Sequence, residues 1–197
     1  MTQEISMLSL MQPFAEQFDL AEGRMCDPRQ QIVRRASEMR GYYADGAALE
    51  ALIAAAQDPP HYETFECPVP EECGQVKYCI SKLYPGTVGG ECFMTKGHYH
   101  ALAAAAEVYL CLRGRGLMLM KTAGGECRWE EFAPGRLVYA PPYWAHRSIN
   151  TGDEPLISLC LYPGDAGHNY GDIRTEGFPR RVFRREGKIA IEEPRRA

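Results

Sequence analysis

The sequence predicts an all-β protein, built as an antiparallel barrel or jelly roll with a short helical extension at its N-terminus. From His61 onward the apolar residues come in short β-branched or aromatic runs, and clusters of Gly, Pro, Asn and Asp separate these runs. About ten such runs occupy roughly 130 residues, and none of the intervening segments resembles the helical crossover that parallel strands need. The strands are therefore expected to pair antiparallel.

Length and composition narrow the class of protein. The chain has 197 residues, 45% of them hydrophobic, and a formal net charge of -4, so one compact domain without a basic field for nucleic acid is expected. Its apolar runs are far shorter than the about 20 residues that a bilayer-spanning helix needs. Residues 1–6 lack the basic start of a secretory signal, and the eight cysteines contain no Cys-x-x-Cys pair. We expect a cytoplasmic protein with reduced thiols that binds neither nucleic acid nor membrane.

The first sixty residues differ from the rest. Residues 29–40 are predicted to form a short helix or turn with a charged face. Asp45 is expected to cap a second helix over residues 46–57, which Pro59 and Pro60 end. Apolar residues in that helix follow the i, i+3, i+4, i+7 pattern: Leu49, Leu52, Ile53 and Ala56. Residues 1–60 are thus expected to form a helical or extended cover over a barrel of residues 61–192.

Eleven strands follow from the alternating and β-branched runs. They are expected near residues 62–67, 76–84, 91–95, 107–113, 117–121, 127–132, 136–140, 146–150, 156–162, 180–185 and 188–192. Turn signals such as Pro85-Gly86 and Pro134-Gly135 separate them. The alanine run over residues 103–106 is predicted to be a tight helical turn or a loop.

A group of histidines and one glutamate carries the chemistry. His98 and His100 stand two apart, so on a strand both imidazoles point to the same face. Glu107 opens an otherwise apolar run, and His146 follows Pro141-Pro142-Tyr143-Trp144-Ala145. Three imidazoles and a carboxylate suit Fe, Mn, Co, Ni or Zn, and a six-coordinate ion would keep two open positions for catalysis. A His-x-His pair alone is more often part of a surface strand than of a metal site. The surrounding motifs are therefore needed to distinguish the two.

Those motifs resemble a known family. The spacing around His98, Glu107 and His146 is similar to the paired motifs of the cupin superfamily, although the interval from His100 to Glu107 is longer than usual and Tyr143 stands where many cupins have Gly. Both departures are typical of the cupin-type, metal-dependent phosphoglucose isomerases. Segments that look very like that family include residues 83–86, 95–100, 106–109, 138–147 and 162–171, and the resemblance covers residues 32 to 190.

The resemblance implies a cupin double-stranded β-helix and a set of functional residues. It assigns one divalent metal ion per subunit, with Fe2+ favoured and Mn2+, Zn2+, Ni2+ or Co2+ open, to four ligands: His98, His100, Glu107 and His146. It implies an isomerase of glucose 6-phosphate and fructose 6-phosphate, acting in glycolysis and gluconeogenesis. Substrate contacts are expected from hydroxyls and backbone amides at Ser81, Thr95, Gly97, Tyr162, Tyr62 and Tyr170. Thr95 is favoured over its neighbour Lys96, because strand alternation sends the two side chains to opposite faces.

The catalytic base stays open between two residues. Glu107 is expected to act both as ligand and as base, with Tyr109 and His168 orienting or protonating the substrate, while His168 is the alternative base. A direct hydride shift would need no base. Without the resemblance, Tyr109 would be assigned to barrel packing.

Competing functions and minor assignments complete the predictions. An Fe(II)-dependent dioxygenase and a non-catalytic sugar-binding cupin are the alternatives, because cupins host many chemistries. A homodimer is expected, since dimerisation hides exposed sheet edges. His61 is left as a surface or core residue. Four arginines are assigned to solvated charges or interface contacts: Arg34, Arg35, Arg180 and Arg181.

Overall fold

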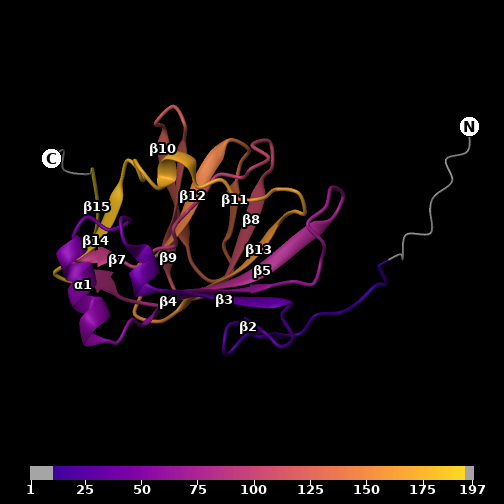
Figure 1. The fold of residues 1–197 in the computed structure, drawn as a ribbon, viewed down its shortest axis with the longest axis horizontal. Helices are drawn as coiled ribbons and strands as arrows, with labels where there is room; N and C mark the ends of the chain where they lie inside the picture. Colours follow the sequence, from indigo (N-terminus) through magenta and orange to yellow (C-terminus); the bar gives the residue numbers. More distant parts are fainter. Residues whose placement is uncertain (1–10, 194–197) are drawn as a thin grey trace, which may run out of the picture.

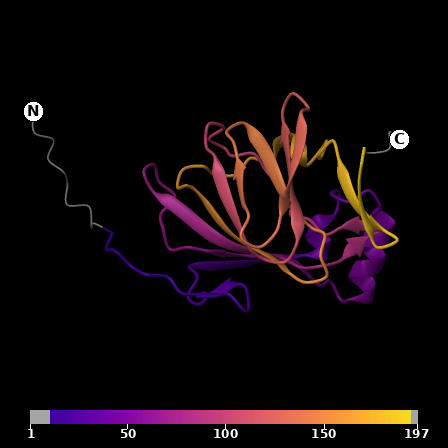
Figure 2. The ribbon, with the colours of Figure 1, turned by 180° about the vertical axis from the view of Figure 1, so that it is seen from behind.

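The computed structural model describes residues 11–193 and shows antiparallel sheets packed face to face (Figures 1 and 2). In chain order the elements are β1 (Phe18–Asp19), β2 (Arg24–Met25), β3 (Gln30–Arg35), the 3-10 helix η1 (Ala36–Met39), α1 (Gly46–Ala55), β4 (Pro60–Glu66), β5 (Val76–Leu83), β6 (Thr87–Val88), β7 (Glu91–Cys92), β8 (Glu107–Arg113), β9 (Gly116–Thr122), β10 (Cys127–Phe132), β11 (Leu137–Ala140), β12 (Trp144–Asn150), β13 (Leu156–Pro163), the 3-10 helix η2 (Gly171–Ile173), β14 (Arg181–Arg185) and β15 (Lys188–Glu192).

Two sheets build the barrel. The larger sheet has the strand order β11-β8-β13-β5-β4-β3, and the smaller one has the order β10-β9-β12. A four-stranded sheet, β15-β14-β7-β6, extends the fold at the end where α1 lies in Figures 1 and 2. Every pairing described in residues 11–193 is antiparallel, so the predicted all-β jelly roll is confirmed.

The main core lies between the two barrel sheets. Side chains from both sheets form one buried cluster, with Leu83, Val138 and Cys160 on the larger sheet and Met118 and Phe132 on the smaller. A second, smaller cluster covers the outer face of the larger sheet, where Met25, Phe65, Ile80 and Ile157 pack together. Because the larger sheet is buried on both faces, its central strands have few exposed positions.

The N-terminal segment is the main correction to the expected fold. Of the helix or turn predicted over residues 29–40, only residues 36–39 are helical, as η1, whereas residues 30–35 form strand β3. This strand pairs with β4, with Ile32 opposite Thr64 and Arg34 opposite Tyr62. The β-branched pair Ile32-Val33 suits a strand, and hydrogen bonding to the edge of β4 outweighs the helical charge pattern. The predicted cover therefore supplies an edge strand of the barrel sheet. The domain division at residue 60 stays a prediction.

Most other elements agree with the sequence. Helix α1 is confirmed with Asp45 as its cap, since the Asp45 carboxylate accepts from Ala48 N at 2.8 Å. The helix ends earlier than expected, because Gln57 and Asp58 take positive φ values of 53° and 55° before the prolines. Residues 103–106 form a loop, one of the two predicted alternatives. Of the expected strand at 91–95, β7 keeps two residues, and Met94 makes an isolated bridge to Ile149. None of the helices in residues 11–193 is long and apolar enough to cross a membrane.

Candidate metal centre

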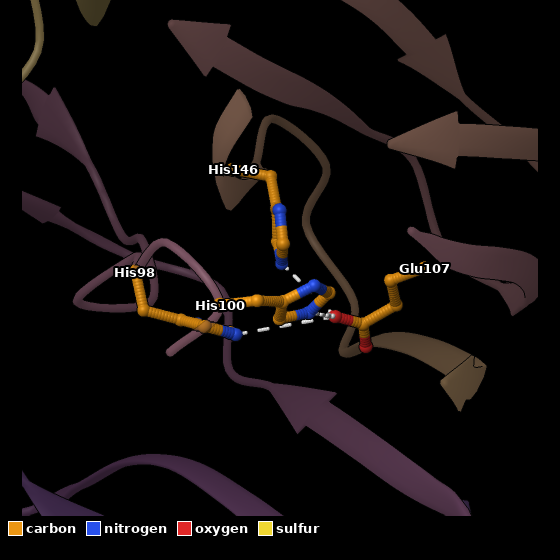
Figure 3. Close-up of side chains that lie close together, drawn as sticks. All are labelled: His98, His100, Glu107 and His146. Atoms are coloured by element: carbon orange, nitrogen blue, oxygen red, sulfur yellow. Dashed lines mark hydrogen bonds and ion pairs between the residues drawn. The ribbon is translucent and has the colours of Figure 1, made fainter. Parts of the chain in front are cut away.

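Four side chains converge inside the barrel (Figure 3). The donor atoms of His98, His100, Glu107 and His146 all lie within 4.8 Å of one another. Glu107 Oε2 lies 3.0 Å from His146 Nε2, 3.1 Å from His100 Nε2 and 3.9 Å from His98 Nε2. Glu107, His100 and His146 are buried, and His98 is partly exposed. The predicted ligand set is therefore assembled at one point.

Three different parts of the chain position this cluster. Glu107 begins β8 and pairs with Ala140 of β11, while His146 lies on β12 of the facing sheet. His98 and His100 lie in the irregular segment between β7 and β8, so the regular strand geometry considered for this pair does not apply. Two backbone hydrogen bonds of 3.2 and 3.1 Å between His98 and His146 fix that segment to β12.

Gly97 lets the segment pass close to β12. Its φ is +74°, a value that L side chains rarely adopt. A Cβ at this position would lie 3.0 Å from the His146 carbonyl oxygen and 2.9 Å from the Phe178 ring. The glycine is required because it places His98 beside His146 without a clash.

Backbone carbonyls set the tautomers of two imidazoles. His100 Nδ1 lies 3.1 Å from the Ala105 carbonyl oxygen, and His146 Nδ1 lies 3.3 Å from that of Trp144. A carbonyl can only accept, so each Nδ1 carries the hydrogen, and in the neutral form of either ring Nε2 turns a lone pair toward Glu107. His146 Nε2 is buried, and its orientation gives no hydrogen bond to Glu107. Nitrogen lone pairs that face a carboxylate oxygen at about 3 Å repel it, and a cation bound between them would remove this repulsion.

The electrostatics also suit a metal. Burial would raise the pKa of Glu107, but its close contacts with His100 and His146 hold that pKa below its usual range. Burial and the neighbouring His146 push the pKa of His98 well below 6.5. Burial opposes protonation of His100 as well, although contact with Glu107 raises its pKa overall. The cluster thus holds an ionised carboxylate beside at least one neutral imidazole, which are the forms that bind metal ions.

A cavity of about 340 Å³ opens onto the cluster. Its floor is the inner face of the larger sheet, where register places Thr64 of β4 opposite Ser81 of β5. His98 and Glu107 line this cavity, whereas His100 and His146 are not among its lining residues. All the other predicted catalytic and substrate residues line it: Tyr62, Ser81, Thr95, Gly97, Tyr109, Tyr162, His168 and Tyr170.

The cavity walls hold their polar groups in defined contacts. The His168 ring lies 4.3 Å from the His98 ring and stacks on Tyr170 at 6.2 Å and 10°. Burial lowers the pKa of His168 below its usual value. Tyr162 Oη donates to Glu66 Oε2 at 3.0 Å. Tyr109 is buried against His146, with 5.5 Å between ring centroids.

Sequence reasoning missed Arg34 and Glu66 and ranked Lys96 below Thr95, yet all three charged residues line the cavity. Arg34, assigned to solvent or an interface, lines it from β3 and pairs with Glu38 at 2.7 Å. Lys96, expected to point away from Thr95, lines it as well, because the backbone there is not a regular strand. Glu66 lines it two positions beyond Thr64 on β4, and the strand period of two could have revealed it.

The structure also decides two other minor assignments. Arg181 is not a solvated charge, because it donates to the buried carboxylate of Glu91 at 2.8 and 3.0 Å. His61 is a core residue with an exposed fraction of 0%, and its Nε2 lies 2.7 Å from Tyr43 Oη.

Comparison with known proteins finds a matching family and relatives that cover most of the chain. Residues 33–194 match the family described as glucose-6-phosphate isomerase (GPI). A glucose-6-phosphate isomerase of Thermococcus litoralis is 45% identical over 92% of this chain and 95% of its own length, and that of Pyrococcus abyssi is 48% identical over 83% and 87%. Among solved structures, an oxalate decarboxylase of Lactobacillus farciminis has a TM-score of 0.44 at 18% identity, covering 55% of this chain and 30% of its own.

Proposed function

The chain belongs to the glucose-6-phosphate isomerase family and interconverts glucose 6-phosphate and fructose 6-phosphate, and we propose that it does so with a divalent metal ion held by His98, His100, Glu107 and His146. One observation carries the proposal: four donor atoms within 4.8 Å of one another adjoin a cavity of substrate size. A dioxygenase and a non-catalytic sugar-binding protein, the two alternatives, are not favoured by these relatives.

We propose Fe2+ as the resident ion, because mixed imidazole and carboxylate donors suit it; Mn2+, Zn2+, Ni2+ and Co2+ use similar donors. When bound, such an ion polarises the sugar carbonyl and stabilises negative charge on the two oxygens that exchange roles, an effect of several kcal/mol. The reaction moves one proton between C1 and C2 of the open-chain sugar. A second proton moves between the oxygens on those carbons, so no co-reactant is consumed.

Glu107 is proposed as the base for the carbon proton. The contacts drawn in Figure 3 converge on one of its carboxylate oxygens, Oε2, and leave the other oxygen without a contact to the three imidazoles. The low pKa of Glu107 keeps it ionised at neutral pH, although it also makes Glu107 a weaker base than a free carboxylate.

His168 is proposed to move the proton between the sugar oxygens. Because burial lowers its pKa, it is neutral near pH 7 and can both accept and donate. Its stacking on Tyr170 and its contact with the His98 ring hold it beside the metal cluster. Tyr109 is proposed to orient the substrate, since its buried ring packs against His146.

The substrate phosphate is proposed to lie against the hydroxyls of Ser81, Thr95 and Tyr162 and the backbone of Gly97 in the cavity wall. Thr95 Oγ1 accepts from Ser148 N at 3.1 Å, which fixes the hydroxyl and leaves its hydrogen free for an anion. Tyr62 and Tyr170 line the same cavity and are proposed to contact the sugar.

The oligomeric state and compartment are further proposals. Strand β11 forms one edge of the larger sheet and exposes Leu137 and Tyr139, whose exposed fractions are 61% and 53%. We propose that a second copy covers such an edge in a homodimer. Sedimentation showing a species of 22.1 kDa at all concentrations would refute this. We propose that the enzyme works in the cytoplasm, as its place in glycolysis and gluconeogenesis requires. Cell fractionation tests that assignment.

The proposed roles of the ligands are tested by metal content together with turnover. His98→Ala and His146→Ala are each expected to lose bound metal and isomerase activity together, whereas Arg128→Ala, an exposed control on β10, keeps both. Full activity in a metal-free His146→Ala enzyme would refute the proposal.

A further inference from the structure

A second cavity lies beside the catalytic one. Its volume is about 290 Å³, close to the lower limit for a small-molecule site. Arg34, Lys96 and Tyr170 line both cavities, so the two share a wall. The other lining residues of this second cavity come from η1, the segment after it and the end of η2: Glu38, Arg40, Tyr42 and Arg174.

Positive charge dominates the second cavity. Four lining residues are cationic, and Glu38 is the one anionic residue among those that line it. Arg34 is compensated by Glu38, and Arg40 is held by both carboxylate oxygens of Glu50 at 2.6 and 2.9 Å. Within residues 11–193, neither Lys96 nor Arg174 forms an ion pair with a carboxylate.

Two of the lining cations, Lys96 and Arg174, are not offset by an ion pair in residues 11–193. Lys96 Nζ lies 5.7 Å from the centre of the Tyr42 ring, a contact that keeps the ammonium group at the cavity wall. Arg174 then adds a second cation without an ion pair to the same cavity. Like charges in one cavity repel each other, and a bound anion offsets that repulsion.

The residue types define the chemistry of the ligand. Guanidinium groups present a planar fork of donors that matches the oxygens of a phosphate, and an ammonium group adds a point charge. The Tyr42 and Tyr170 rings supply hydroxyl donors and flat walls. The space accommodates a phosphate with a few attached atoms rather than a polymer.

We propose that this second cavity is an anion site that binds a phosphate group, either as the free ion or as a small phosphate ester, in addition to the substrate in the catalytic cavity. Because Arg34, Lys96 and Tyr170 line both cavities, phosphate bound here changes the affinity of the catalytic cavity for sugar phosphate. The coupling is reciprocal, as any equilibrium coupling must be.

The experiment counts phosphate sites by titration calorimetry on the metal-loaded protein. Inorganic phosphate is titrated into the wild type, into the double variant Arg40→Gln/Arg174→Gln, and into the control Arg115→Gln. Arg40, Arg174 and Arg115 are all exposed, and Arg115 lines neither cavity, so each variant is expected to fold. Glycerol 2-phosphate, an ester that the isomerase cannot convert, is titrated in parallel to tell an ester site from a free-phosphate site.

We expect two sites per chain in the wild type and the control, and at least about tenfold weaker binding at one of them in the double variant. One site in all three proteins, or two equally tight sites in all three, overturns the proposal. Because heat reports binding directly, a protein without isomerase activity would still test this site. Failure of the second site is therefore distinguishable from failure of the catalytic proposal.

Discussion

Acidification is predicted to destabilise the fold through His61. This imidazole is fully buried, with its Nε2 2.7 Å from Tyr43 Oη and its ring 4.0 Å from the Phe93 ring. Burial lowers the pKa of His61 from 6.5 to about 3. The folded protein therefore keeps His61 neutral at pH values where the unfolded chain protonates it.

The size of the effect follows from this difference in pKa. Between pH 6.5 and about 3 the unfolded chain binds a proton that the folded chain does not, so the stabilisation is complete above pH 6.5 and is lost as the pH falls toward 3. The full difference corresponds to about 5 kcal/mol, since one pKa unit is about 1.4 kcal/mol. By about pH 5 the loss reaches roughly 2 kcal/mol.

The assay compares wild type with His61→Gln by urea unfolding across this pH range. A chelator in both samples removes metal release as a source of pH dependence. Wild type is expected to lose about 2 kcal/mol more than the variant between pH 6.5 and pH 5. Parallel pH profiles for the two proteins would refute the reasoning, whatever their absolute stabilities.

Three further substitutions test the site and its support. Glu107→Gln is expected to lower turnover about 100-fold or more by removing the proposed base; near-normal turnover with metal retained, measured by metal analysis, would reject that role. Gly97→Ala is expected to cost about 1 to 3 kcal/mol in unfolding free energy, because φ is +74° and the Cβ meets His146 and Phe178; unchanged stability and unchanged metal affinity in a chelator competition would contradict this. Arg147→Met removes hydrogen bonds of 2.6 and 3.3 Å to the Lys96 carbonyl oxygen and is expected to lower the free energy of unfolding by about 2 to 3 kcal/mol. A loss of less than about 1 kcal/mol, measured by urea unfolding, would contradict this expectation.

The metal cluster was predictable because short sequence motifs identify its residues. His98 and His100 stand two apart, and the motifs around Glu107 and His146 give a recognisable spacing. The strands were predictable for the same reason, since alternation and turn residues mark them directly. What the pattern could not show is that His98 and His100 leave regular strand geometry, and that His98 is held instead by a backbone bridge to His146.

The missed features depend on long-range pairing. Residues 30–35 carry a helical charge pattern, and their strand conformation comes from pairing with β4. Arg34 enters the cavity wall through that pairing, so its role could not be read from its neighbours in sequence. Lys96 was assigned to the wrong face because alternation applies to a regular strand, and residues 95–97 do not form one.

The most direct test of the central claim measures conversion of fructose 6-phosphate to glucose 6-phosphate by the purified protein, with and without chelator, followed by addition of single divalent metals. Loss of activity with chelator and recovery with metal, greatest for Fe2+, is the result predicted from the convergence of His98, His100, Glu107 and His146. Full activity in protein shown to be free of metal would contradict the proposed metal centre. Inactivity with metal shown to be bound would contradict the assigned substrate.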